Sequence, residues 1–203
     1  MPQPLLLASS SPYRRSLLAR IGLPFTWASP DIDETPLANE TPEALATRLA
    51  CEKAAAMADA YPGHWIIGSD QVASLNNGEQ LSKPGNLETA IEQLTRSSGQ
   101  TATFFTGLAL LDAKTGKQLS LCETYRAHFR TLTPEEIRRY LTVEQPFDCA
   151  GSFKMEGLGI TLFEKLEGPD PNSLVGLPLI ALTNMLRQWG LNPLLAAQPA
   201  ASS

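Results

Sequence analysis

Cysteine is scarce in this sequence of 203 residues, which has three, at positions 51, 122 and 149. They are widely spaced, odd in number and form no CxxC pair, so the sequence predicts neither a disulfide framework nor a zinc site. Such cysteine usage is typical of a reducing compartment, and we expect a cytoplasmic location.

Long hydrophobic runs and basic tracts are also missing. The apolar stretch from Leu5 to Ala8 is too short for a signal peptide, and no basic residue precedes it. No stretch reaches the roughly 18 apolar residues of a membrane span. The net charge is -5, the pI is about 5.1, and the basic residues are scattered. We therefore expect neither a membrane nor a nucleic acid as partner, whereas a small anionic ligand needs only a local cluster of cations.

Histidine occurs only twice, at positions 64 and 128, and neither residue has a Cys, Asp or His at metal-ligand spacing. A histidine-centred metal site or catalytic triad is therefore not expected. The motifs GxxxxGK[ST], GxGxxG and GxSxG are absent as well, which excludes the common phosphate-binding and hydrolase signatures.

Strand and helix signals alternate along a chain of globular composition, with 43% hydrophobic and 18% charged residues. Apolar runs predict strands, and Ser/Thr-Pro pairs or capping boxes predict helix starts. In the first half we expect a strand at 4–8, a helix from Pro12 to Gly22, loop or extended chain at 24–40, a helix at 42–60, a strand at 65–69 with Asp70 at its exit, and a helix at 87–96. In the second half we expect strands at 101–111 and 119–131 around a hairpin turn, a helix from the cap at Thr133 to 143, a strand at 159–164, and a long apolar helix within Leu174 to Gly190 despite Pro178.

This order predicts an α/β fold. We expect one domain over residues 1–195, with two lobes around a central cleft, and a disordered tail over 196–203 because its composition is of low complexity.

Serines and arginines gather in the segment Ser9–Arg15, between a strand and a helix. Free backbone N–H groups, hydroxyls and guanidinium groups at a helix N-terminus form a typical phosphate site. Arg14 shares the inward stripe of the apolar residues at positions 17, 18 and 21, which is unusual for a solvated charge. The alternative is an ordinary capped helix with surface arginines.

Charged residues at three other places could take part in chemistry. Lys53 continues the apolar stripe of Leu45 and Leu49, so it either extends to solvent at a helix end or reaches into a site. Asp70 follows a buried strand, where a carboxylate can accept a proton from water or hold a divalent cation, or can simply cap the turn. Glu34 lies in an acidic loop and could supply a second carboxylate, although such loops are usually just solvated.

Two further segments give weaker signals. Lys83 precedes Pro84, which stiffens the chain beside a cation that could neutralise a leaving pyrophosphate. The segment 149–157 is rich in small residues and could approach a ligand closely, although an ordinary loop has the same composition.

Together these segments resemble the Maf family of nucleotide pyrophosphatases. The resemblance extends from Leu5 to about Pro193, and its motifs follow in the family's order: LLLASSSPYRRSLL, DIDETP, CEKA, IIGSDQV, SKP, CAGSFKMEGLG and DPNSLVGLPL. It implies an elongated α/β fold with a mixed sheet, cleavage of a nucleoside triphosphate to monophosphate and pyrophosphate, and dependence on Mg²⁺ or Mn²⁺. A homodimer is a further expectation from the resemblance.

The resemblance also implies roles for individual residues. Asp70 would activate water, and Glu34 would help to place the metal together with it. The triphosphate would be bound by Ser9, Arg14, Lys53 and Lys83. Cations and a metal would then neutralise charge on the phosphates while a carboxylate orients the nucleophile.

Three positions indicate the base. Family members that act on dTTP and UTP typically have arginine at the position of Tyr13 and threonine after the catalytic aspartate, where this chain has Gln71. The chain resembles instead the members that prefer 7-methyl-GTP, which more usually have tryptophan at the position of Tyr13. An electron-rich ring attracts the positively charged 7-methylguanine, Gln71 can hydrogen-bond the base, and Glu156 can match its charge.

Two alternatives remain open at this point. The protein could bind a nucleotide and regulate cell division without essential catalysis, because Maf proteins are associated with septum inhibition. It could also keep the same reaction and act on pyrimidine or other modified nucleotides.

Overall fold

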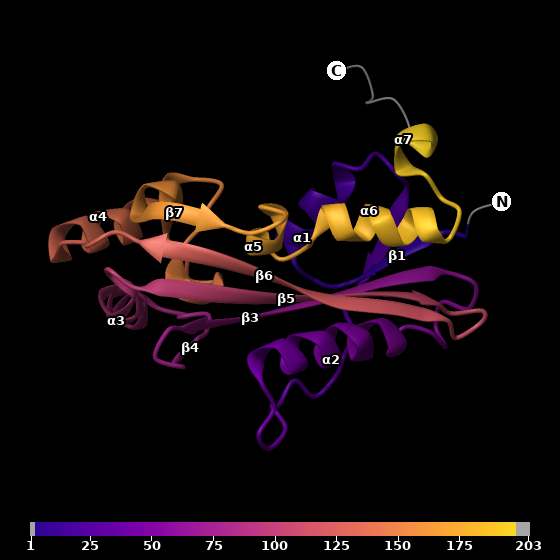
Figure 1. Ribbon diagram of the computed structural model, residues 1–203, viewed down its shortest axis with the longest axis horizontal. Coiled ribbons are helices and arrows are strands. Elements are labelled where there is room, and N and C mark those ends of the chain that lie inside the picture. Colours follow the sequence, from indigo (N-terminus) through magenta and orange to yellow (C-terminus); the bar gives the residue numbers. More distant parts are fainter. Residues whose placement is uncertain (1–2, 198–203) are drawn as a thin grey trace. The chain divides into compact units, whose positions relative to one another are not determined.

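The structure, a computed structural model that describes residues 3–197, contains a mixed sheet of seven strands with helices against it (Figure 1). The strand order is β2-β1-β3-β5-β6-β7, and β4 pairs with β3. The strands are β1 Leu5–Ala8, β2 Phe25–Ala28, β3 Trp65–Leu75, β4 Gln80–Leu81, β5 Thr101–Asp112, β6 Gln118–Phe129 and β7 Phe163–Glu167. Strand β1 is parallel to β2 and β3, whereas β3–β4 and β6–β7 are antiparallel pairs.

The helices alternate with these strands along the chain, and the predicted α/β class is confirmed. They are α1 Pro12–Ala19, α2 Pro42–Ala55, α3 Leu87–Ser97, α4 Pro134–Glu144, α5 Asn172–Val175, α6 Leu179–Gln188 and α7 Pro193–Ala196, with 3-10 helices η1 Ala150–Ser152 and η2 Leu158–Leu162. None of the helices among the described residues has both the length and the apolar character needed to cross a membrane.

The chain divides into two compact units, each assembled from separate stretches. The first comprises residues up to 71, residues 106–123 and residues from 170 onward, and the second comprises 72–105 and 124–169. The long strands β3, β5 and β6 contribute residues to both units. The single domain over 1–195 stays a prediction. Of the predicted tail, Ala196 ends helix α7, and residues 198–203 lie outside the described part of the chain.

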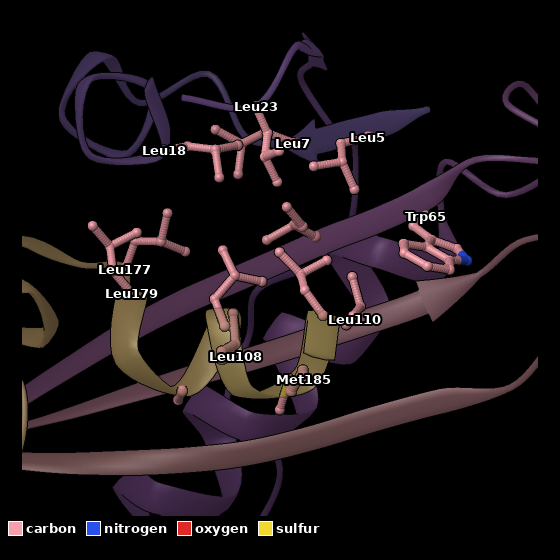
Figure 2. Close-up of a cluster of buried hydrophobic side chains, with 14 of the residues drawn as sticks. Leu5, Leu7, Leu18, Leu23, Trp65, Leu108, Leu110, Leu177, Leu179 and Met185 are labelled. Atoms are coloured by element: carbon pink, nitrogen blue, oxygen red, sulfur yellow. The ribbon is translucent and has the colours of Figure 1, made fainter. Parts of the chain in front are cut away.

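In the first unit, alternate residues of the central strands point to opposite faces, and both faces are buried. One face packs against α1 and α6, as Figure 2 shows for its leucines, Trp65 and Met185. The other face packs against α2. The first face includes Leu5, Leu7, Ile67, Leu108 and Leu110, and the second includes Leu6, Ala8, Ile66, Ala109 and Leu111. Burial on both faces explains why these strands are continuous apolar runs in the sequence.

Helix α2 lies directly against the backbone of β3 and β5. A Cβ atom at Gly68 would lie 2.0 Å from the carbonyl oxygen of Ala50, and one at Gly107 would lie 2.0 Å from that of Ala46. Only glycine permits this close approach. Because Lys53 is on the same helix and Asp70 follows Gly68 on the same strand, the contact brings these two charged residues together.

The second unit has an aromatic core. Phe104, Phe129, Phe153 and Phe163 form pairs whose ring centroids lie 4.7 to 6.0 Å apart, mostly edge to face. Helices α3 and α4 pack against each other. The capping box predicted at Thr133 is confirmed, because its side chain and that of Glu136 each accept a hydrogen bond from the other residue's backbone N–H.

Several predicted boundaries are wrong. Residues 24–40, expected to be loop or extended chain, contain β2, a short strand at the edge of the sheet whose pairing with β1 is not visible in local sequence. The expected strand at 159–164 is mostly the 3-10 helix η2, and β7 begins only at Phe163. Helices α1 and α2 end earlier than predicted, at Ala19 and Ala55.

The apolar helix predicted within Leu174–Gly190 is present as α6, Leu179–Gln188, and a separate short helix, α5, precedes it. Gly176 adopts a left-handed conformation with φ 114°, which ends α5. Pro178 then precedes α6, where its missing N–H does no harm. Asp70, predicted at the exit of its strand, lies inside β3, which continues to Leu75.

Candidate active site

A buried lysine bridges two carboxylates in the first unit. Lys53 Nζ lies 2.6 Å from Asp70 Oδ1 and 2.6 Å from Glu34 Oε1. The side chains of Lys53 and Asp70 are 10% and 11% exposed, and that of Glu34 is 58% exposed. Of the two alternatives for Lys53, the structure has the side chain turned inward rather than extended to solvent.

Arg48 ties the acidic loop that carries Glu34 to helix α2. Its guanidinium donates to Glu40 at 2.7 and 2.9 Å, to Glu52 at 3.0 Å and to the carbonyl oxygen of Thr35 at 3.1 Å. The hydrogen bond from Arg48 lowers the pKa of Glu40 to about 2. The sequence alone suggests a solvated acidic loop, but Arg48 holds this loop at the side chain of Glu40 and at the backbone of Thr35.

The serine-rich segment forms a capped helix start. Ser9 is buried, and its hydroxyl oxygen accepts a hydrogen bond from the N–H of Ser11 at 3.1 Å. Ser11 is the N-cap of α1, and its side chain accepts from the N–H of Arg14 at 3.4 Å. The segment therefore forms the capped helix start of the alternative interpretation, and it also keeps Ser9 at a buried position next to that start.

Arg14 turns inward, as its helical spacing predicted. Its Nε donates to the carbonyl oxygen of Gly176 at 2.8 Å. Burial lowers the pKa of the Arg14 guanidinium, and the charges of Asp70 and Glu34 act in the opposite direction. The cation is thus poorly solvated and lies within electrostatic reach of both carboxylates, a setting in which an arriving phosphate is attracted more strongly than in water.

The neighbours of Arg14 on α1 behave differently. The guanidinium carbon of Arg15 lies 4.1 Å from the ring centroid of Trp27 on β2, a cation–π contact. Tyr13 is half-buried on the same helix.

Gln71 is oriented by carbonyl groups. Its Nε2 donates to the carbonyl oxygen of Ser173 at 2.7 Å and, at longer distances, to Leu174 O at 3.3 Å and to Thr106 Oγ1 at 3.1 Å. Because a backbone carbonyl can only accept, the amide nitrogen must face these groups. The atom that Gln71 has left to offer a ligand is therefore its acceptor, Oε1.

Two predicted residues belong to the second unit and are exposed. Lys83 follows β4 and precedes the buried Pro84. Glu156 stands between η1 and η2, in a segment held by α4: Lys154 N donates to the hydroxyl of Tyr140 at 3.0 Å, and Leu158 N donates to Glu144 at 2.5 Å. Their roles toward triphosphate and base stay predictions.

Within residues 3–197, which the structure describes, the three cysteines form no disulfide with one another. The part of the chain that the structure describes also holds no group of three or more His, Cys, Asp or Glu side chains arranged to bind a metal ion. Glu34 and Asp70 are two carboxylates that converge on the ammonium of Lys53.

A family model described as Maf-like protein matches residues 4–189. The chain belongs to this family. The predicted membership is confirmed, and the segments that the model covers include both units.

Curated relatives of the chain carry the name 7-methyl-GTP pyrophosphatase. One from Alcanivorax borkumensis is 56% identical over 92% of this chain and 94% of its own length. Another from Pseudomonas savastanoi pv. phaseolicola is 57% identical, over 93% and 97% respectively, and one from Pseudoalteromonas atlantica is 53% identical, over 93% and 96%. A solved HAM1 protein from Coxiella burnetii is similar at a TM-score of 0.48 and 14% identity, over 92% of this chain and 99% of that one.

Sequence reasoning missed several contacts of this Maf-like chain. It gave no role to Arg48 or Trp27, because Arg48 contacts a loop and Trp27 on β2 contacts Arg15 on α1, two pairings that local sequence does not show. It also missed the carbonyl groups of Ser173 and Gly176. The motif that contains them, DPNSLVGLPL, was part of the family resemblance and is the one signal that could have pointed to this segment.

Proposed function

We propose that this Maf-like chain is a nucleotide pyrophosphatase that hydrolyses 7-methyl-GTP to 7-methyl-GMP and pyrophosphate. The names of its curated relatives, at 53 to 57% identity, support this substrate and reaction. The observation that carries the proposal is the convergence of Asp70 and Glu34 on the buried ammonium of Lys53, within electrostatic reach of Arg14. Its role is the removal of modified nucleotides before polymerases incorporate them.

The triphosphate is bound by cations and by the start of α1. Arg14 and Lys53 supply positive charge in a setting with little water, and Ser9 adds a hydroxyl next to a helix N-terminus. When a phosphate binds, the ammonium of Lys53 can donate N–H groups both to its oxygens and to the carboxylates that Lys53 already contacts. Lys83 of the second unit neutralises charge on the leaving pyrophosphate.

Asp70 accepts the proton from the attacking water. The water oxygen forms a bond to the α phosphorus as the bond from that phosphorus to the α–β bridging oxygen breaks. The electron pair of the broken bond leaves with pyrophosphate. Orientation of the water by a fixed carboxylate and charge neutralisation by cations are the two contributions that phosphoryl transfer needs.

A divalent cation, Mg²⁺ or Mn²⁺, would be held by Glu34 and Asp70. The donor set fits, because hard carboxylate oxygens suit these ions and both side chains already place an oxygen 2.6 Å from one positively charged group. When bound, such an ion neutralises negative charge on the phosphates.

The base is recognised through its charge and its donors. The ring of Tyr13 attracts the positive charge of 7-methylguanine, an effect of about 1 kcal/mol or more when water is excluded. Gln71 offers Oε1, an acceptor that suits the N–H groups of guanine's edge. Glu156 adds a negative charge that matches the base.

Pyrophosphate release from a panel of nucleotides tests the proposal. The panel contains 7-methyl-GTP, GTP, UTP and dTTP with Mg²⁺ or Mn²⁺, and the native chain is compared with Asp70→Asn, which keeps the size of the side chain. We expect rapid release from 7-methyl-GTP and a loss of at least roughly 1,000-fold in the variant, because the proton acceptor is removed.

The other outcomes separate the alternatives. Release confined to UTP and dTTP would keep the reaction and reject the proposed base. No release from any nucleotide, with nucleotide binding retained, would reject the enzyme and favour a regulatory binding protein. In that case a division phenotype would persist in Asp70→Asn.

We also propose that the chain forms one Maf-like domain over residues 1–195, assembles as a homodimer and works in the cytoplasm. Light scattering after gel filtration tests the dimer, and a single cooperative unfolding transition by both calorimetry and circular dichroism tests the single domain.

A further inference from the structure

The segment from Asp170 to Leu177 has no role in the reaction described above, yet its backbone contacts residues that do. Helix α5 within it lies beside α1, the helix that carries Arg14 (Figure 1). Three of its carbonyl groups point at functional side chains: Gly176 O accepts from Arg14 Nε, and the carbonyls of Ser173 and Leu174 accept from Gln71.

A fully buried carboxylate holds this segment in place. Asp170 is 0% exposed, and its Oδ1 accepts from both the backbone N–H and the side-chain amide of Asn172, at 2.8 and 2.6 Å. Its Oδ2 accepts from the N–H of Ile180 at 2.8 Å. Ile180 lies in the first turn of α6, which has no side-chain cap from its own N-cap residue, so Asp170 serves as a remote cap.

The other end of the segment is fixed by backbone geometry. Gly176 has φ 114°, and its N–H bonds to the carbonyl oxygens of Asn172 and Ser173, at 3.1 Å each. Its own carbonyl oxygen accepts from Arg14 Nε at 2.8 Å and from the hydroxyl of Ser69 at 2.9 Å. A Cβ atom at Gly176 would lie 3.3 Å from Arg14 Nε, so even alanine would crowd the guanidinium.

We infer that Asp170 is a positioning residue: it fixes the orientation of the Arg14 guanidinium through the carbonyl group of Gly176. This inference rests on the proposed function, because it assumes that Arg14 binds the triphosphate. The Nε bond to Gly176 fixes the plane of the guanidinium and leaves its terminal nitrogens to a phosphate. Asp170 never contacts the nucleotide; it determines where the carbonyl lies.

A double-mutant cycle tests the inference in the full chain. Arg14→Lys keeps the positive charge but removes Nε, and Asp170→Asn keeps the size of the side chain but turns one acceptor into a donor. We expect each single change to lower kcat/KM for 7-methyl-GTP by roughly tenfold to 100-fold, the range of a charged hydrogen bond. The double variant should lose little more than the worse single variant, because Arg14 is already misplaced when Asp170 is gone.

Asp112→Asn is the matched control. Asp112 also accepts backbone hydrogen bonds in a turn of the first unit, from Lys114 and Thr115, but it has no contact with the segment. Its effect should multiply with that of Arg14→Lys. If Asp170→Asn does not fold, Gly176→Ala replaces it, and the same non-multiplicative result is expected.

Binding of inorganic tripolyphosphate gives a readout independent of turnover, and it is measured from the rise in unfolding temperature with tripolyphosphate concentration. The same coupling is expected in the dissociation constant for tripolyphosphate. Multiplicative losses in both assays would overturn the inference while leaving the proposed function intact. A native chain that releases no pyrophosphate, but shows the coupling in tripolyphosphate binding, would reject the proposed function and support the inference. No tripolyphosphate binding by the native chain would overturn the inference.

Discussion

Two lysines of the same proposed site differ in how the chain holds them. Lys53 of the first unit lies near the end of a helix, 10% exposed, with two carboxylates at 2.6 Å. Lys83 of the second unit is exposed in a short connection between β4 and α3. Fixing a free lysine side chain on a ligand costs about 1.5 to 2 kcal/mol of conformational entropy, a cost that folding has already met for Lys53.

The same contrast holds for the other candidates. Arg14 and Gln71 donate to fixed carbonyl groups in the first unit, whereas Glu156 of the second unit is exposed on a turn. Electrostatic stabilisation of a transition state depends on groups that need no reorganisation at the moment of reaction. We therefore expect the first unit to determine the rate and the second to determine mainly how strongly the substrate binds.

Replacement of the two lysines by methionine gives the largest expected difference. Lys53→Met should lower kcat by roughly 100-fold to 1,000-fold, because a fixed cation is lost at the phosphates. It should also destabilise the fold by about 3 kcal/mol, because two carboxylates lose their buried partner. Lys83→Met should raise KM by roughly tenfold and leave the unfolding temperature unchanged. Steady-state pyrophosphate release measures kcat and KM of the two variants, and thermal unfolding measures their stability. Equal losses of kcat in the two variants would reject the proposed difference between Lys53 and Lys83.

Tyr13 and Glu156 are the residues proposed to recognise the base through its charge. We expect Tyr13→Arg combined with Glu156→Gln to lower the ratio of kcat/KM for 7-methyl-GTP over UTP by roughly tenfold, because a cation–π contact and a matching charge are both lost. Tyr13→Trp is the control that keeps an electron-rich ring and should keep the ratio. An unchanged ratio in the double variant would reject these residues as determinants of the base.

Arg48 allows a smaller test of preorganisation. Arg48→Met removes the hydrogen bonds that Arg48 donates to Glu40 and to the carbonyl oxygen of Thr35, and so releases the loop that carries Glu34. We expect the Mn²⁺ concentration for half-maximal activity to rise about threefold to tenfold, with kcat at saturating Mn²⁺ nearly unchanged, because only the ordering of one ligand is lost.

Arg96→Met is the matched control for this test. Arg96 of the second unit forms a comparable ion pair with Glu79 at 2.8 Å, on the surface. Its replacement should leave the Mn²⁺ requirement as it was. If Arg48→Met does the same, the clamp on the acidic loop has no role in placing Glu34.

Sequence periodicity predicted those parts of the fold in which one local pattern dominates. The inward stripe of α1 and α2 indicated Arg14 and Lys53, and the capping box at Thr133 marked the start of α4 correctly. The edge strand β2 and the break at Gly176 were missed, because the first depends on pairing with β1 and the second on a left-handed turn that a long apolar pattern conceals.

For the site, residue types were predictable and their partners were not. Ser9, Asp70 and Lys53 could be singled out from the sequence and the family resemblance. The carbonyl groups that orient Arg14 and Gln71 have no residue signature, since every residue has one and only the fold decides where it points. The fully buried Asp170 likewise resembles any turn aspartate until its three hydrogen bonds are known.

Glu123 gives the smallest expected effect and a pH signature. Burial raises the pKa of this half-buried carboxyl, the charge of Asp170 raises it further, and the hydrogen bond from the Ser173 hydroxyl acts against both. The folded state therefore holds the proton more tightly than the unfolded state, so the contribution of Glu123 to stability is fully present below pH 4.5 and is lost as the pH rises through the raised pKa.

Glu123→Gln removes this loss, because its amide oxygen can still accept from Ser173 and carries no charge to bury. We expect the unfolding temperatures of the native chain and the variant to agree at pH 4 and the variant to be more stable at pH 8, by about 2 °C or less, since water screens a half-exposed group. Calorimetry across this range measures the difference. A variant that is less stable at pH 8 than at pH 4, relative to the native chain, would mean that the ionised carboxylate is needed to hold Ser173 and the segment that contains it, Asp170 to Leu177.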